Sequence, residues 1–129
     1  MLEVGIRNTK TITCEKEQTA LAMGSGTLEV FATPAMIALM EACAAQSVEE
    51  LLEEGQTTVG TSLDIDHLSA SPLGATIRCE SVLEEIDNRK LTFSVSAFDN
   101  GGLIGKGIHS RFIVESERFF NKAQKKIEK

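Results

Sequence analysis

The sequence lacks the residues with which proteins usually hold nucleic acids. It contains no tryptophan and no tyrosine, and the 129-residue chain carries a formal net charge of −6. Non-specific binding to nucleic acids is driven mainly by lysine and arginine side chains that neutralise phosphates, and bases stack on aromatic rings. We therefore expect no nucleic-acid partner.

Cysteine and long apolar runs are also scarce. The three cysteines, at positions 14, 43 and 79, are odd in number and widely spaced, which fits neither a disulfide framework nor a paired metal site. No apolar run approaches the length that crosses a bilayer, and the sequence does not open on a charged, apolar and small-residue leader. These absences predict a cytoplasmic protein with no membrane association and no metal.

What remains is an ordinary globular composition. Apolar residues make up 42% of the chain and charged residues 25%, which is typical of soluble domains and far from disordered ones. A chain of this length buries roughly two-thirds of its unfolded surface. We expect a single domain over residues 1–129, with a core that needs no covalent cross-links.

Hydrophobic periodicity predicts one long helix and five strands. Thr33 is a good N-cap and Pro34 is tolerated in a first turn, so the helix is expected from Pro34 to about Glu54, with Gly55 ending it. Alternating residues predict a strand near 9–14, and after the helix four more. Those four segments are 57–68, 75–86, 91–98 and 103–115.

This order predicts an α+β protein. A strand, a long helix and then successive antiparallel strands follow the plan of the hot-dog fold, in which a curved sheet wraps around a central helix. An open sheet edge is prone to pair with another chain, and hot-dog proteins commonly cover it by pairing two protomers. A homodimer is therefore expected.

One carboxylate lies within the apolar pattern of the helix. Counting from Ile37 in steps of three and four reaches Glu41, Ala44, Ala45 and Val48, so Glu41 is expected to face inward or into a cleft. Burial of an unpaired carboxylate is costly, and such a group is usually paired or used in chemistry. The alternative is a glutamate at the edge of the apolar face, with its carboxylate in water. Periodicity alone does not separate the two.

Three polar residues together could carry chemistry: Thr33 at the helix start, Glu41 two turns later, and His67 on the apolar side of the next strand. Thioester cleavage needs a nucleophile or activated water, a proton carrier and donors for an oxyanion. Each residue also has a structural reading, with Thr33 as a plain N-cap and His67 as a core histidine. His109 shares a strand face with Gly105, Gly107 and Arg111, and we expect it at the surface or an interface.

The sequence motifs around these residues resemble those of a known family. The segments E-V-F-A-T-P-A-M-I-A-L-M-E and T-V-G-T-S-L-D-I-D-H-L-S-A-S-P-L-G resemble those of hot-dog thioesterases of the fluoroacetyl-CoA thioesterase type. The resemblance runs through nearly the whole chain. It implies that Thr33, Glu41 and His67 are catalytic. It also implies that Gly60 lies beside the acyl group and that substrate is bound by Phe31, Asn121 and Lys122.

The resemblance implies hydrolysis of an acyl-CoA to a carboxylic acid and free CoA, without a metal or redox cofactor. Glu41 would act as general base or as the attacking carboxylate, Thr33 would position the reacting groups, and His67 would carry the proton. Pro34 stands where the fluoroacetate-specific member has a small flexible residue, so a fluorinated substrate does not follow. We expect a short acyl chain.

Two other functions compete with hydrolysis. A hot-dog enoyl-CoA hydratase would need an aspartate five residues before a histidine, but Ser62 and Ile104 occupy those positions. A non-catalytic acyl-CoA sensor would keep the cleft without turnover, and the retention of all three reactive side chains argues for catalysis. The basic tail either meets a ligand phosphate or is solvated; it contains Arg118, Lys122, Lys125, Lys126 and Lys129.

Overall fold

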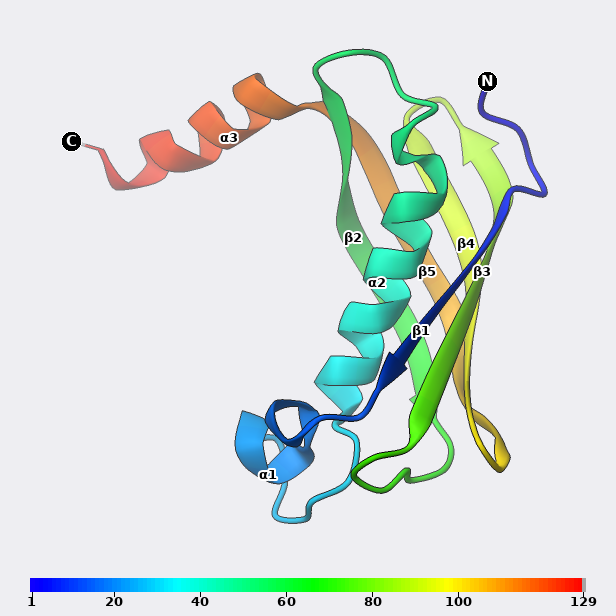
Figure 1. The fold of residues 1–129 in the computed structure, drawn as a ribbon. Coiled ribbons are helices and arrows are strands. Elements are labelled where there is room, and N and C mark those ends of the chain that lie inside the picture. Colours follow the sequence, from blue (N-terminus) through cyan, green and yellow to red (C-terminus); the bar gives the residue numbers. More distant parts are fainter. Residues whose placement is uncertain (129) are drawn as a thin grey trace.

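A five-stranded antiparallel sheet wraps around helix α2 in the computed structural model, which describes residues 1–128 (Figure 1). The strand order is β1-β3-β4-β5-β2, so β1 and β2 form the two edges. The strands are β1 (Arg7–Thr13), β2 (Gln56–His67), β3 (Thr76–Asp87), β4 (Lys90–Asp99) and β5 (Gly102–Glu115). The helices are η1 (Lys16–Gln18), α1 (Ala20–Met23), α2 (Thr33–Glu49), α3 (Ser116–Gln124) and η2 (Lys125–Ile127).

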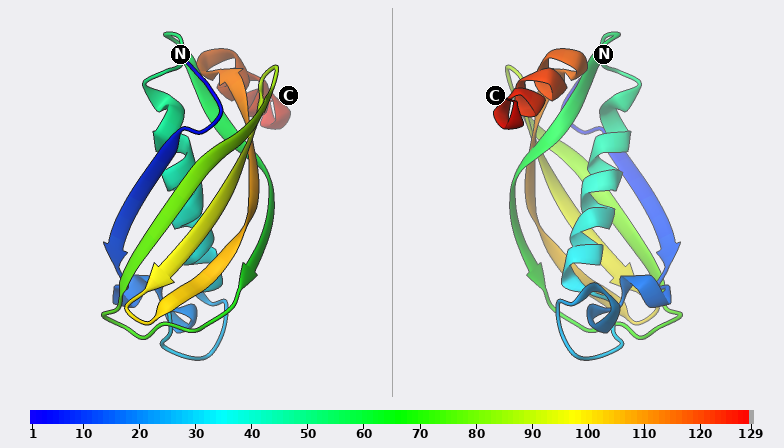
Figure 2. Two further views of the ribbon diagram at one scale, coloured as in Figure 1. Left: turned by 90° about the vertical axis from the view of Figure 1, so that its right-hand side faces the viewer. Right: turned by 90° about the vertical axis from the view of Figure 1, so that its left-hand side faces the viewer.

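This arrangement is the α+β hot-dog fold that the sequence predicted. The two side views show α2 lying along the inner surface of the curved sheet (Figure 2), and α3 leaves the body of the molecule at one end (Figure 1). No helix within residues 1–128 has the length and apolar character needed to span a membrane. The predicted strands agree with the observed ones to within a few residues, whereas the 14–27 connection contains the short helices η1 and α1, which were not predicted.

Helix α2 begins one residue earlier than predicted. Its N-cap is Ala32, which has an extended backbone, and Thr33 is the first helical residue, with Pro34 next. No side chain caps this end of the helix. The prediction of Thr33 as the N-cap is therefore wrong, and the Thr33 hydroxyl is free to bond elsewhere.

The helix also ends earlier than predicted, at Glu49 instead of about Glu54. The Leu51 N–H donates to the Val48 carbonyl, and this bond between residues three apart, instead of four, ends the α-helical geometry. Glutamates occupy positions 49, 50, 53 and 54, and negative charge at a helix C-terminus is unfavourable because the carbonyl end of the helix is itself negative. Gly55, with a φ of 86°, then turns the chain into β2.

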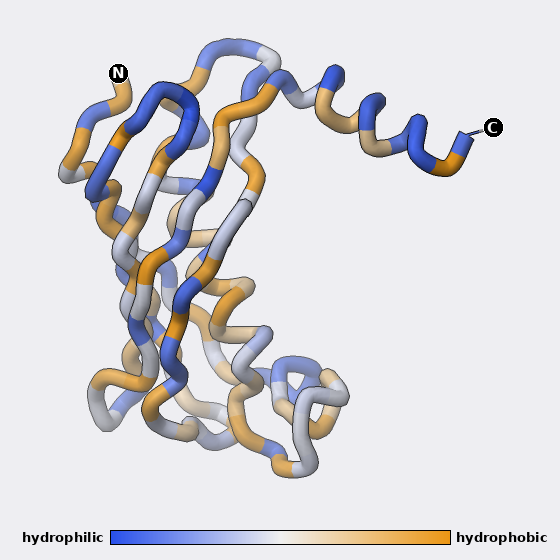
Figure 3. Tube along the Cα trace, turned by 180° about the vertical axis from the view of Figure 1, so that it is seen from behind, coloured by the Kyte–Doolittle hydropathy of each residue, from blue (hydrophilic) through white to orange (hydrophobic). Residues whose placement is uncertain are grey.

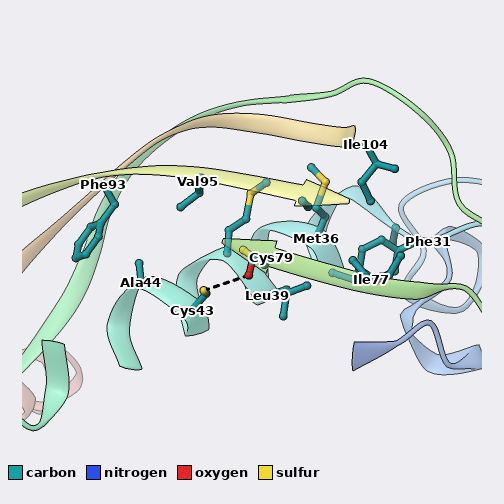
Figure 4. Close-up of a cluster of buried hydrophobic side chains, with 14 of the residues drawn as sticks. Phe31, Met36, Leu39, Cys43, Ala44, Ile77, Cys79, Phe93, Val95 and Ile104 are labelled. Carbon is teal, nitrogen blue, oxygen red and sulfur yellow. Dashed lines mark hydrogen bonds between the residues drawn. The ribbon is translucent and has the colours of Figure 1, made fainter. Parts of the chain in front are cut away.

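The core lies between α2 and the inner face of the sheet (Figure 4). The buried stripe of α2 is rotated relative to the predicted one, because Ile37, Glu41 and Ala45 are only half-buried. Glu41 therefore lies on the flank of the helix, and its side chain is 38% exposed. The buried residues of α2 are Ala35, Met36, Leu39, Met40, Cys43, Ala44 and Val48.

A β-bulge in β2 decides which side chains face the helix. The register against β5 shifts between Gly60 and Ser62, so Gly60 faces α2 together with His67. A Cβ atom on Gly60 would run into the Glu41 carboxylate of α2. Strict alternation along β2 would put Gly60 and His67 on opposite faces, but one extra residue in the strand reverses the alternation.

Candidate active site

Thr33 and His67 meet at one end of the molecule. The first turn of α2 presents the Thr33 hydroxyl, and the last residue of β2 presents the imidazole. Thr33 Oγ1 lies 2.7 Å from His67 Nδ1, across 34 residues of sequence. Because the hydroxyl makes no cap to its own helix, it is available for this bond. The pair is the natural starting point for a catalytic site.

The other ring nitrogen of His67 has no partner in this chain. Within residues 1–128, Nε2 of His67 is the one buried side-chain nitrogen or oxygen that makes no hydrogen bond. Burial lowers the pKa of His67, which keeps the ring neutral at pH 7, although the nearby Ser69 backbone makes a smaller contribution in the opposite direction. When Nδ1 accepts the Thr33 proton, Nε2 carries a proton that is available to a bound molecule.

A cavity of about 300 Å³ opens beside this pair. Its volume is at the small end of the range for ligand pockets, which suits a small acyl group better than a long one. Phe31, predicted to bind substrate, lines it together with Thr33 and His67. The remaining lining residues are Ala20, Ser25, Val30, Leu68, Ser69 and Ala70.

Glu41 lies elsewhere along the same helix. Eight residues of α-helix separate it from Thr33 by roughly 12 Å. Its carboxylate oxygen Oε2 lies 3.5 Å from Nη1 of Arg111 and directly against Gly60. Within one chain, therefore, the structure brings Thr33 and His67 together and places Glu41 two helical turns away.

The carboxylate of Glu41 adjoins a buried polar cluster that the sequence did not reveal. Arg111 donates from Nε to Thr58 Oγ1 at 2.8 Å and from Nη2 to the Thr58 carbonyl at 2.9 Å. Its Nη1 donates to His109 Nε2 at 3.1 Å. The Arg111 guanidinium is thus held on two sides while its charge faces Glu41.

His109 is fully buried within the single chain, so the prediction that it lies at the surface or an interface is wrong. Its Nδ1–H donates to the Ser62 carbonyl at 2.9 Å, and its Nε2 accepts from Arg111. These two bonds define the neutral tautomer. Burial, with the Arg111 charge as a smaller contribution, lowers the pKa of His109, while the bond to the Ser62 carbonyl opposes the shift.

The neighbouring glycines explain why this face of β5 is buried. A Cβ on Gly105 would meet the Met36 sulfur of α2, and one on Gly107 would meet the backbone of β2. Glycine at alternate positions lets helix and strand approach closely, which buries the histidine and arginine beyond them. The glycines at the alternate positions 105 and 107 were the feature of the sequence that could have indicated this close packing.

The remaining predicted substrate residues lie on α3. Asn121 and Lys122 are both exposed, and Lys122 lines a separate cavity at the end of the molecule near the start of β2. The structure does not bring either residue to the Thr33–His67 pair of the same chain.

Known proteins resemble this chain over most of its length. A family model described as fluoroacetyl-CoA-specific thioesterase matches residues 14–117. The fluoroacetyl-CoA thioesterase of Streptantibioticus cattleyicolor is 36% identical over 98 residues, which cover 76% of this chain and 70% of that protein.

Solved structures extend the similarity to almost the entire chain. The fluoroacetyl-CoA thioesterase FlK superposes with a TM-score of 0.93 at 30% identity, covering 98% of each chain. A variant of FlK in complex with fluoroacetate and CoA gives a TM-score of 0.87 at 31% identity, covering 92% of this chain and 99% of that one. The chain therefore belongs to the fluoroacetyl-CoA-specific thioesterase family and is a thioester hydrolase with the hot-dog fold.

Proposed function

We propose that this protein hydrolyses short-chain acyl-CoA thioesters to a carboxylic acid and free CoA. The observation that carries this substrate class is the 2.7 Å pair of Thr33 and His67 at the wall of a cavity of about 300 Å³. The similarity to an enzyme crystallised with fluoroacetate and CoA supports the same class. Fluorinated substrates are not part of the proposal.

In the proposed reaction, His67 and Thr33 hold the thioester and Glu41 activates the attack. The Nε2–H of His67 donates to the thioester carbonyl, while Nδ1 accepts from Thr33 and keeps the ring in that tautomer. Water, deprotonated by a Glu41 carboxylate, adds to the carbonyl carbon. The carbon–sulfur bond then breaks, and the departing thiolate takes the proton that Glu41 removed from the water, which restores the carboxylate. In the alternative route, the Glu41 carboxylate attacks the carbonyl carbon directly, and water then hydrolyses the resulting anhydride.

A homodimer would supply the missing carboxylate. Strand β2 is an unpaired edge, and its middle residues 60–64 are exposed. Antiparallel pairing of two β2 edges about this middle would bring Gly60 of one protomer, and Glu41 beside it, toward the His67 end of the other protomer's β2. We therefore propose a homodimer in which each site takes Thr33 and His67 from one protomer and Glu41 from the other.

The proposed compartment is the cytoplasm. All three cysteines are free thiols, and all three are buried. Unpaired thiols are usual where the redox environment is reducing. No metal or redox cofactor enters the proposed reaction.

The test is release of free thiol from a panel of acyl-CoAs of increasing chain length. The proposal predicts turnover that is fastest with the shortest acyl groups. Tight binding of an acyl-CoA without any release of thiol would contradict it and favour a sensor function.

A further inference from the structure

Two serines in the wall of the acyl cavity have no part in the proposed reaction. Ser25 and Ser69 both line the cavity of about 300 Å³, and both residues are exposed. Within residues 1–128 neither hydroxyl bonds to another residue, whereas the buried Ser71 donates from Oγ to Asp99 Oδ2 at 2.7 Å. The Ser25 and Ser69 hydroxyls can therefore donate to, and accept from, a bound molecule.

Hydrogen bonds of the backbone hold the loop that carries Ser25. The Ser25 N–H donates to the Ala20 carbonyl at 3.0 Å, and the Ala20 N–H donates to the Val30 carbonyl at 2.8 Å. Gly26 packs so closely against α1 that a Cβ atom there would lie 3.2 Å from the Ala20 Cβ. The hydropathy view shows a pale, weakly polar stretch of chain in this loop (Figure 3, lower right). This wall of the cavity thus presents a free hydroxyl from an anchored backbone.

Ser69 is anchored in the same way on the opposite segment of chain. It lies two residues beyond His67, and its N–H donates to the Ile104 carbonyl at 3.2 Å. The Leu68 N–H donates to the same carbonyl at 2.6 Å, which ties the end of β2 to β5. The Ser69 side chain makes none of these bonds, so its hydroxyl stays available near the imidazole.

The cavity offers no charge of its own to a substrate. Its lining, within the part of the chain that the structure describes, includes no aspartate, glutamate, lysine or arginine. An acyl group with its own carboxylate would lose water there without gaining a cation, which is costly. The Glu41 carboxylate of the proposed reaction would also repel it. The lining therefore favours an acyl group that is polar but uncharged.

We propose that the substrate is a short hydroxyacyl-CoA whose acyl hydroxyl bonds to Ser25 and Ser69, an inference that deepens the proposed function and rests on it. One hydroxyl can donate to the first serine and accept from the second. An unsubstituted acyl chain would displace water from both serines without replacing those hydrogen bonds. Sites that bond a substrate hydroxyl discriminate against the analogue that lacks it for this reason.

The first experiment compares thioesters that differ only in a hydroxyl. One pair is lactyl-CoA and propionyl-CoA, and the other is 3-hydroxybutyryl-CoA and butyryl-CoA. For at least one pair, the wild type is expected to have a kcat/KM about tenfold higher for the hydroxylated member, the size expected from one or two hydrogen bonds. No preference in either pair overturns the inference and leaves thioester hydrolysis intact. Failure to hydrolyse any of the four overturns the proposed function itself.

A double variant separates recognition from intrinsic reactivity, because a hydroxyl near the carbonyl also alters the reactivity of the thioester. In Ser25→Ala/Ser69→Ala, the ratio of the two kcat/KM values is expected to fall about tenfold relative to the wild type. Ser116→Ala is the matched control, since Ser116 is an exposed serine at the start of α3 and does not line the cavity. A ratio in the double variant equal to that in the control overturns the inference.

The second experiment measures binding without turnover. CoA thioethers that carry the same chains on sulfur, with and without the hydroxyl, cannot be hydrolysed, and titration calorimetry gives their Kd values. The hydroxylated thioether of at least one pair is expected to bind more tightly to the wild type, and the difference should disappear in Ser25→Ala/Ser69→Ala. Equal Kd values within both pairs for the wild type overturn the inference whether or not the thioesters are hydrolysed.

Discussion

The guanidinium of Arg111 lies 3.5 Å from the carboxylate of Glu41, and the arginine is almost fully buried while the glutamate is 38% exposed. A buried cation that is fixed by Thr58 and His109 thereby holds a carboxylate at the flank of α2. Burial lowers the pKa of Arg111, and the Glu41 charge opposes that shift. The arrangement holds the Glu41 carboxylate in one place at the surface where a second protomer is proposed to bind.

Replacing Arg111 with alanine is expected to destabilise the fold strongly. The change leaves the buried Thr58 and His109 groups without their partner, and losses of about 3 kcal/mol are typical when such a network is broken. Urea denaturation of both proteins measures the difference in the free energy of unfolding. Arg7→Ala, at an exposed position of β1, is the control. A loss in the Arg111 variant no larger than in the control would show that the cluster is not structural.

Thr33→Ala is expected to lower activity without lowering stability. A capping threonine contributes about 1 kcal/mol to its helix, but Thr33 makes no cap and bonds to His67 instead. The free energy of unfolding should therefore change by less than a cap is worth, while kcat/KM falls. Thr33→Ser retains the hydroxyl and should keep most of the activity. The expectation fails if the alanine variant loses stability and keeps its kcat/KM.

Gly60→Ala is expected to reduce activity more than stability. The added methyl would displace the Glu41 carboxylate from its place beside Arg111. The carboxylate can move aside because it ends a flexible side chain, whereas the methyl also comes within 3.2 Å of His109 and 3.3 Å of Arg111, so a smaller loss of stability is expected beside the loss of activity. Gly101→Ala, whose added methyl meets only ordinary contact, is the matched control. Equal kcat values for the two variants would argue against a role for the position of Glu41.

Stability is expected to fall as the pH drops below the ordinary histidine pKa of 6.5. Burial depresses the folded-state pKa of both His67 and His109, so the unfolded chain binds protons first as the pH decreases. Their contribution is complete above pH 6.5 and is lost toward the lower folded-state values. The free energy of unfolding, measured between pH 8 and pH 5, should have a smaller slope in His109→Gln than in the wild type. Identical slopes would contradict the assignment.

Alternation and helix punctuation were enough to predict the fold. The predicted strand at 57–68 differs from β2 by one residue at each end, and the predicted break between the strands 75–86 and 91–98 contains the turn at Asn88 and Arg89 that joins β3 to β4. These features depend on residues that are close together in the sequence, so the sequence pattern predicts them. The hot-dog plan followed because one long helix among antiparallel strands has few ways to bury its apolar face.

Contacts between distant segments could not be predicted in the same way. Local preference favours Thr33 as a cap, whereas the actual partner of its hydroxyl is His67 on another element. The bulge after Gly60 depends on pairing with β5, so simple alternation along β2 assigns Gly60 to the wrong face of the sheet. His109 is buried because Gly105 and Gly107 let α2 and β2 close over the strand, which only the assembled sheet shows.

The central claim is that Glu41 drives hydrolysis of a thioester held by Thr33 and His67, and Glu41→Gln tests it most directly. This change preserves the size of the side chain and removes its capacity as base or nucleophile. Loss of a general base typically slows a reaction by about 100-fold or more, so free-thiol release from a short acyl-CoA should fall by that factor, with unfolding unchanged in urea. A folded Glu41→Gln protein that releases thiol at the wild-type rate would contradict the claim.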